Sequence, residues 1–302
     1  MRPLSLAERL PGEASVGLAK LLAGDDPAVS GRTGVRLSDY TDEVLRSGFP
    51  GLRGLDGRAL RLQLDSYLQR VVDRDFTELG HTPRNPDGLR RWMAAYAAAT
   101  ATVTSFERIR AAATSGGETP PARTTVVPYR EVLERLFILD EVPAWQPSRN
   151  RLGQPALAPK HHLVDPALAA RLLNATAADL LAGESPGPVT ARDGTLLGAL
   201  FESLATLSVR VYAQAAEARV GHLRTRGARH EVDLIVERDD GRVIAIEVKL
   251  GPTPKDADLR QLAWLSDQIG DELLDAVVIT TGEAAYRRRD GIAVVPAALL
   301  GP

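Results

Sequence analysis

The chain has 302 residues, of which 44% are apolar and 25% charged, with a formal net charge of −2. This composition indicates a globular protein of two or three domains and excludes a strongly basic nucleic-acid protein, although a local basic surface stays open. The lack of cysteine excludes disulfides and cysteine-based zinc sites or nucleophiles, and it suits the cytoplasm. No apolar run reaches the roughly 18 residues of a membrane span, so we expect no membrane association.

The first part of the chain, residues 1–80, is predicted to be a helical unit. Residues 38–47 begin with a capping residue and acids and are followed by Gly48, which is typical of a helix end. Residues 58–74 repeat apolar side chains at intervals of three and four, which predicts an amphipathic helix.

Residues 81–148 are predicted to form a winged helix-turn-helix domain. Helices are expected over 89–103, 105–113 and 128–136, followed by a strand-like segment. The third helix would be the recognition helix, but it carries two glutamates beside its two arginines. Packing or docking of a partner is therefore favoured over DNA contact for this helix.

Residues 149–302 are predicted to form a mixed sheet flanked by helices, because strands and helices alternate along them. Expected helices cover residues 194–213 and 255–269, and expected strands cover residues 219–224, 273–282 and 291–295. A further helix is expected to begin at Pro166. The adjacent His161 and His162 would point to opposite faces of a short strand, so they cannot chelate one metal together.

A β-hairpin is predicted where two runs rich in β-branched residues, 231–238 and 242–250, flank the turn Asp239–Gly241. A three-residue loop with glycine at the left-handed position is a common way to close such a hairpin. It would place Asp233 opposite Glu247 on one face. A two-residue loop is also favoured and would turn Asp233 away from Glu247, so the register decides the chemistry.

Opposed carboxylates repel, and a divalent cation removes the conflict. Asp233 and Glu247 are therefore candidate ligands for Mg²⁺ or Mn²⁺, and Lys249, two residues farther on, is a candidate polarising base or charge stabiliser. Lysine occurs only at positions 20, 160, 249 and 255, so a lysine at the end of this apolar strand points to a specific role. The alternative is a solvated edge hairpin that carries a Glu/Lys pair.

Two further residues are weighed as contributors to this site. Glu202, the acid of the predicted helix 194–213, is a candidate third carboxylate or a surface glutamate. Gln261, in the helix after the hairpin, is interpreted as part of a solvated helix face rather than as a substrate contact.

Several segments resemble the bacterial and archaeal AAA+-type ATPases that end in a nuclease-like domain of unknown function. The segments are MRPLSLAER, SGFP, DSYLQRVVDRD, KHHLVDPALAARLL and RHEVDLIVE…IAIEVK. The resemblance implies a helical remnant of an ATPase module over 1–80, a winged helix, and a C-terminal restriction-endonuclease-like domain. The last carries the PD-(D/E)XK pattern, which Asp233 and Glu247-Val248-Lys249 match, and the helix before that pattern often supplies a further acid, a position that Glu202 matches.

One departure from the resemblance concerns ATP. Members of that group begin with a nucleotide-binding core, whereas this chain opens on the PLSL segment and contains no G-x-x-x-x-G-K-[ST]. We therefore expect no ATP binding by the chain alone, and a separate ATPase subunit or self-association as partner. Two functions stay open: a Mg²⁺-dependent nuclease acting on DNA or RNA, and a non-catalytic module that binds DNA or a protein.

Overall fold

The computed structural model describes residues 2–24, 27–81, 83, 85–114, 120–146, 158–183 and 195–302. Two compact units emerge from its contacts. The helical unit comprises Thr41–Glu141 and Lys160–Ser203, and the sheet unit comprises Arg2–Tyr40, Val142–Pro159 and Leu204–Pro302. The expected domains 1–80, 81–148 and 149–302 remain predictions, and the two compact units cut across them.

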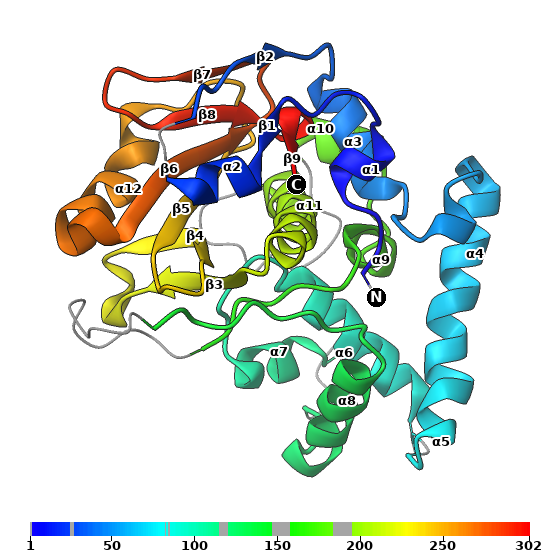
Figure 1. The fold of residues 1–302 in the computed structure, drawn as a ribbon. Coiled ribbons are helices and arrows are strands. Elements are labelled where there is room, and N and C mark those ends of the chain that lie inside the picture. Colours follow the sequence, from blue (N-terminus) through cyan, green and yellow to red (C-terminus); the bar gives the residue numbers. More distant parts are fainter. Residues whose placement is uncertain are drawn as a thin grey trace. The chain divides into compact units, whose positions relative to one another are not determined.

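The sheet unit is built on a seven-stranded mixed sheet, drawn in Figure 1. Its strands, in spatial order, are β2 (Gly31–Arg32), β7 (Ala284–Arg287), β8 (Ala293–Pro296), β6 (Leu273–Thr280), β5 (Val243–Val248), β4 (Glu231–Glu237) and β3 (Arg219–Arg224). Strands β5, β6 and β8 run parallel, and the remaining neighbours are antiparallel. The mixed sheet expected from the sequence is confirmed.

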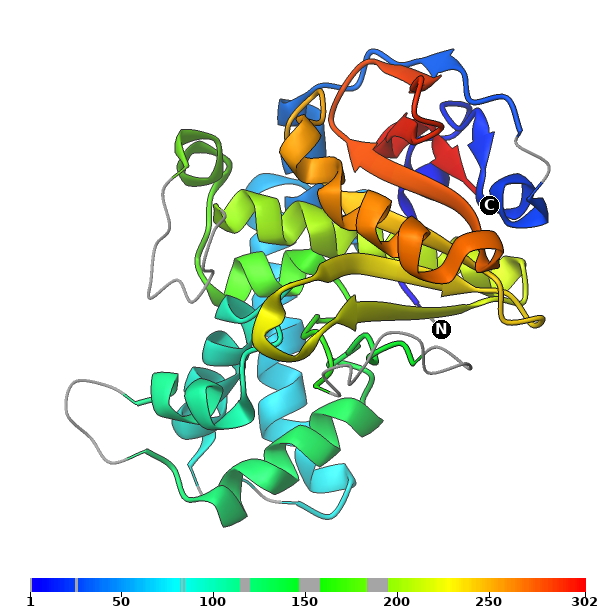
Figure 2. The same cartoon turned by 90° about the vertical axis from the view of Figure 1, so that its left-hand side faces the viewer.

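Helices lie on both faces of this sheet, with α12 (Asp256–Ile269) on one side and α2 (Leu18–Ala23) on the other, as Figures 1 and 2 show. A buried apolar cluster lies between α12 and the sheet. Leucines of α12 at positions 259, 262 and 265 pack there against alternate residues of β5 and β6. The buried cluster fixes which side chains of the β4–β5 hairpin face α12.

The N-terminal segment belongs to the sheet unit, which differs from the helical unit expected for residues 1–80. Strand β1 (Val16–Gly17) pairs in parallel with β9 (Leu300–Gly301), and β2 pairs with β7. The Tyr40 hydroxyl accepts a hydrogen bond of 3.1 Å from the backbone N–H of Ala298. Helix α1 (Leu6–Arg9) and the short helix η5 (Ala297–Leu299) also belong here.

The helical unit contains the helices between α3 (Leu37–Leu45), which spans the boundary between the units, and α11 (Leu196–Ala215). They are η1 (Pro50–Leu52), α4 (Gly57–Arg70), the π-helical turn η2 (Val71–Asp75), α5 (Phe76–Glu78), α6 (Pro86–Ala98), α7 (Phe106–Ala112), α8 (Arg123–Arg135), α9 (Pro166–Leu172) and α10 (Ala177–Ala182). The predicted helix start at Pro166 is confirmed.

A winged helix stays a prediction, because only part of its expected pattern is present. The three helices α6, α7 and α8 follow in the expected order. After α8 the backbone turns at Phe137, whose φ is +56°, and Leu139 then makes an isolated bridge with Leu163. Among the described residues of the helical unit no named strand follows α8, so a wing is not formed there.

Helix α11 (Leu196–Ala215) is long and apolar enough to cross a membrane, but 72% of its apolar window is buried inside the structure. Such burial is typical of a helix that packs in a protein core.

Candidate active site on the β4–β5 hairpin

The hairpin closes with the three-residue loop, so the predicted register is confirmed. The Arg238 N–H donates to the Arg242 carbonyl at 2.9 Å, and the Gly241 N–H donates back to the Arg238 carbonyl at 3.0 Å. Gly241 has a φ of +82°, the left-handed conformation that this loop requires. Pairing then runs from Glu237 opposite Val243 to Leu234 opposite Ile246. The next pair in this register is Asp233 and Glu247.

A β-bulge lies at Asp233, and no local sequence pattern predicts it. On the β3 side, Gly221 pairs with Ile235 and Leu223 with Val232, so His222 alone faces Asp233 and Leu234. A bulge inserts one residue into a strand and re-aims its side chain. The Asp233 carboxylate points toward β5, where it accepts a hydrogen bond from the backbone N–H of Val248.

Three charged groups meet at this end of the hairpin. The Lys249 Nζ donates to Glu247 Oε2 at 2.7 Å and lies 3.9 Å from Asp233 Oδ2. The backbone N–H of Val248 donates to the same Asp233 oxygen at 2.9 Å. Glu247 is 4% exposed and Asp233 9%, whereas 30% of the Lys249 side chain is exposed. The acids are thus mostly enclosed, and solvent reaches the site through the lysine.

The electrostatics of the cluster keep Lys249 charged. Burial alone would lower the pKa of its ammonium, but attraction to Asp233 and Glu247 and the hydrogen bond to Glu247 together raise it well above the usual lysine value. Asp258, in the first turn of α12, adds to the same effect. Lys249 is therefore an ammonium at neutral pH, which suits charge stabilisation rather than proton abstraction.

Glu202, the expected third acid, has a lysine partner in the helical unit. The Lys160 Nζ donates to Glu202 Oε1 at 2.8 Å, and the Lys160 side chain is only 1% exposed. Among the described residues, no three His, Asp or Glu side chains gather as a group that could hold a metal ion. The described part of the site therefore has two carboxylates, those of Asp233 and Glu247. A role for Glu202 in the site stays a prediction.

Gln261 was interpreted as part of a solvated helix face, but it is half-buried and has a specific partner. Its Oε1 lies 2.9 Å from His230 Nδ1. The His230 ring stacks on Trp264 with 3.8 Å between ring centroids and 7° between planes. His230 ends the loop before β4, so these contacts tie that loop to α12. The sequence hinted at the contact only through the helical spacing of Gln261 and Trp264.

His161 and His162 are both buried in the helical unit, at 1% and 2% exposure. The His161 Nε2 lies 2.6 Å from the carbonyl of Thr104, and its ring packs edge-on against Tyr96 and Phe106. These contacts fit the structural role expected for the two histidines.

The expected recognition helix α8 uses Arg130 for internal contacts. The Arg130 guanidinium donates to Glu134 and Glu141 and lies 4.0 Å over the Phe106 ring. Because the Arg130 guanidinium already contacts two carboxylates and a ring, few of its N–H groups can donate to a phosphate. This agrees with a packing role.

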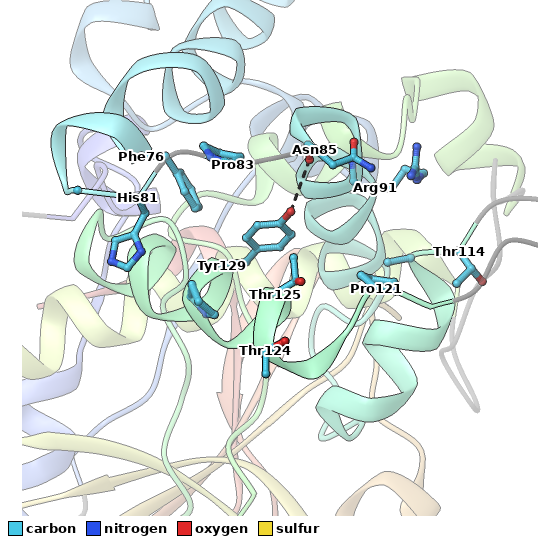
Figure 3. Close-up of a pocket in the computed structure, with 14 residues that line it drawn as sticks. Phe76, His81, Pro83, Asn85, Arg91, Thr114, Pro121, Thr124, Thr125 and Tyr129 are labelled. Carbon is cyan, nitrogen blue, oxygen red and sulfur yellow. Dashed lines mark hydrogen bonds between the residues drawn. The ribbon is translucent and has the colours of Figure 1, made fainter.

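The helical unit also encloses a cavity of about 730 Å³, shown in Figure 3. Tyr129 lies in the cavity wall, and its hydroxyl is 3.5 Å from the Asn85 carbonyl. Its described lining includes Arg91 and His81 but no Asp or Glu. A second cavity, of about 660 Å³, lies beside α12 in the sheet unit. Asp233 and Glu247 line neither of these two cavities.

Comparisons with known proteins cover most of the chain in two parts. Residues 37–179 match the family described as Domain of unknown function (DUF8612), and residues 197–300 match Domain of unknown function (DUF4143). No curated protein and no solved structure matches the chain. The second match begins in α11 and contains Glu202, Asp233, Glu247 and Lys249. Residues 197–300 thus carry a domain that is found in AAA-ATPase-associated proteins.

Proposed function

We propose that the chain is a Mg²⁺- or Mn²⁺-dependent nuclease of the PD-(D/E)XK kind, related to AAA+ ATPases, that hydrolyses phosphodiester bonds in DNA. The observation that carries this proposal is the single ammonium of Lys249, which reaches both Glu247 and Asp233 across the hairpin. Two acids and one cation at one strand end are the groups that metal-assisted phosphodiester hydrolysis uses.

The donor set fits a hard divalent cation. Mg²⁺ prefers oxygen ligands and takes one or two carboxylates together with waters and substrate phosphate oxygens. Asp233 and Glu247 supply two carboxylates on adjacent strands, and the exposed part of Lys249 leaves an approach from solvent. When bound, such an ion supplies Lewis acidity to the phosphate and a more acidic water.

The protein's own contribution is to position charge. Lys249 stays protonated, so its Nζ can donate to a non-bridging phosphate oxygen as negative charge develops there. The Val248 N–H holds the Asp233 carboxylate across the hairpin. Glu247 sits in the β5 strand with 5% of its side chain exposed, which fixes its orientation. These three restraints preorganise the acid pair before a substrate arrives.

The arrangement of the sheet unit supports the nuclease-like fold. Helix α11 is followed by the antiparallel strands β3, β4 and β5, by α12, and by β6 parallel to β5. The resemblance to nuclease-like domains implies a mixed sheet flanked by helices, and this order of elements is compatible with it. Together with the match to DUF4143, it supports kinship with AAA-ATPase-associated proteins.

The ATPase function itself is not part of the proposal. The sequence contains no phosphate-binding loop, so we expect no ATP binding and propose a separate ATPase subunit or a second copy of the chain as partner. A nucleotide-dependent rise in melting temperature in the presence of Mg²⁺ would contradict this.

Cleavage of supercoiled plasmid in Mg²⁺ or Mn²⁺ tests the nuclease proposal. We expect nicking by the wild type and its loss, by at least about a hundredfold, in Glu247→Gln. The matched control is Asp267→Asn, which removes an exposed carboxylate of α12. Nicking that survives in Glu247→Gln would identify a contaminant, and no nicking with any divalent ion would contradict the proposal.

A second function, a non-catalytic module that binds DNA or a protein, is favoured by one specific observation. Among the described side chains no third ligand joins Asp233 and Glu247, and Lys249 already compensates Glu247. In such a module the ion pair would be structural. Mn²⁺ binding that is absent from both the wild type and Asp233→Asn would select this alternative.

A further inference from the structure

The loop that joins β3 to β4, Thr225–His230, carries two arginines directly before the strand that holds Asp233. We call it the arginine loop. Arg226 and Arg229 are both exposed, and the loop contains no acid. Within the described part of the chain neither guanidinium has a carboxylate partner, whereas Arg224, just before the loop, lies 3.6 Å from Glu231. The loop therefore presents two uncompensated positive charges to solvent.

The arginine loop is closed by its own hydrogen bonds. The Thr225 N–H donates to the His230 carbonyl at 2.9 Å, and the His230 N–H donates to Thr225 Oγ1 at 3.0 Å. Between them, Gly227 and Ala228 both adopt positive φ, +77° and +54°. An alanine in this conformation persists where surrounding contacts hold it. The backbone that carries Arg226 and Arg229 thus has a defined conformation.

The base of the loop is attached to α12 on the side of the acid pair. His230 stacks on Trp264 and contacts Gln261, and the α12 first turn carries Asp258, which acts electrostatically on Lys249. Figure 2 shows the β3–β4 pair running alongside α12 in the sheet unit. The loop and Asp233 therefore lie at the same end of β4, because the loop ends directly before Glu231 and Asp233 is the third residue of the strand.

The arginine loop lies close to the acid pair along the chain. Arg229 precedes Asp233 by four residues, and β4 begins between them at Glu231. An arginine so near along the chain is placed to contact phosphates that flank a phosphate held at Asp233 and Glu247.

We propose that the arginine loop is a phosphate clamp that positions a DNA duplex across the Asp233–Glu247 pair, with Arg226 and Arg229 as positioning residues. The choice of DNA as ligand rests on the proposed function. Guanidinium groups pair with phosphate oxygens in a two-pronged geometry, and such contacts fix the register of a protein on a duplex without reading its sequence. The two arginines of the clamp supply the local positive charge that DNA binding requires on a chain whose net charge is −2.

Binding without hydrolysis tests the clamp. The anisotropy of a fluorescent 20-base-pair duplex is measured in EDTA over a series of salt concentrations, for the wild type, for R226A/R229A and for the matched control R58A/R61A. Arg58 and Arg61 are exposed on α4, and no described carboxylate pairs with them. We expect R226A/R229A to bind roughly tenfold more weakly and to lower the slope of log K against log salt by about 1.8, or about 0.9 per lost phosphate contact. The control should keep the wild-type slope.

The outcomes of this experiment distinguish a failure of the phosphate clamp from a failure of the proposed nuclease activity. Equal binding by R226A/R229A and wild type overturns the clamp, even if the wild type cleaves DNA. Equal losses in both double variants, or a wild type that binds no duplex, overturn it as well. Loop-dependent binding without cleavage in any divalent ion supports the clamp and contradicts the nuclease.

Discussion

The backbone N–H of Val248 donates to the carboxylate of Asp233 at 2.9 Å, so a side chain joins the hairpin strands one residue beyond the last main-chain pair, Leu234 with Ile246. The bulge at Asp233 makes this contact possible. It anchors one acid of the candidate site to the strand that carries Glu247 and Lys249. Predictions about the site follow from that anchoring.

Replacing Lys249 with Met should destabilise the protein and create a dependence on divalent ions. Without the ammonium, Asp233 and Glu247 repel each other, and we expect the free energy of unfolding to fall by about 1–2 kcal/mol in EDTA, a modest loss because the Lys249 side chain is 30% exposed and solvent screens its ion pairs. Millimolar Mg²⁺ should restore more stability to Lys249→Met than to the wild type, measured by urea unfolding. Lys255→Met removes an exposed lysine and serves as control. Equal effects of Mg²⁺ on all three proteins would show that the acids do not bind the ion.

Replacing Glu202 with Gln should affect folding rather than metal binding. Lys160 would lose the carboxylate that accepts its hydrogen bond while staying buried, and we expect a loss of about 3 kcal/mol in the free energy of unfolding. Mn²⁺ affinity, measured by calorimetry on the folded variant, should stay within about twofold of the wild type. A tenfold weaker affinity would instead make Glu202 a ligand.

Stability at high pH should depend on Tyr40. Burial raises the pKa of its phenol to about 12, against an ordinary value near 10. The folded state therefore holds this proton more tightly, and the stabilisation is complete below pH about 10 and is lost as the pH rises toward 12. Urea unfolding of wild type and Tyr40→Phe from pH 8 to 12 checks this. The variant should lose about 1 kcal/mol at pH 8, where the Ala298 N–H loses its acceptor, and should show a shallower alkaline decline. Parallel declines would contradict the assignment.

The hairpin loop should be sensitive to substitution at Gly241. Its φ of +82° strains any residue with a Cβ, so Gly241→Ala should cost about 1 kcal/mol. Gly34→Ala is the control, because a Cβ there meets no neighbour and the residue has no positive φ. Thermal melts of both variants provide the measurement. Similar melting temperatures would mean that the loop does not constrain the register.

The sequence predicted those elements that local patterns determine. The hairpin follows from β-branched runs around Asp239–Gly241, and the start of α9 follows from Pro166. The pairings of β1 with β9 and of β2 with β7 were missed, because β1, β2 and β9 have only two residues each and the paired strands lie more than 250 residues apart. Such short strands carry no periodicity of their own.

The candidate site was predictable only in part. Register and spacing pointed to Asp233, Glu247 and Lys249, and the structure brings these three together. The bulge at Asp233 depends on how β3 pairs, which local sequence does not specify. The Lys160 partner of Glu202 likewise comes from a contact 42 residues away.

Titration calorimetry of Mn²⁺ into wild type, Asp233→Asn and the control Asp267→Asn measures whether Asp233 and Glu247 bind a divalent ion. We expect a single site in the wild type and in Asp267→Asn, with affinity at least about tenfold weaker in Asp233→Asn, because one of two carboxylate ligands is lost. Mn²⁺ binding of equal strength in all three proteins, or binding by none of them, would contradict a metal site on the β4–β5 hairpin.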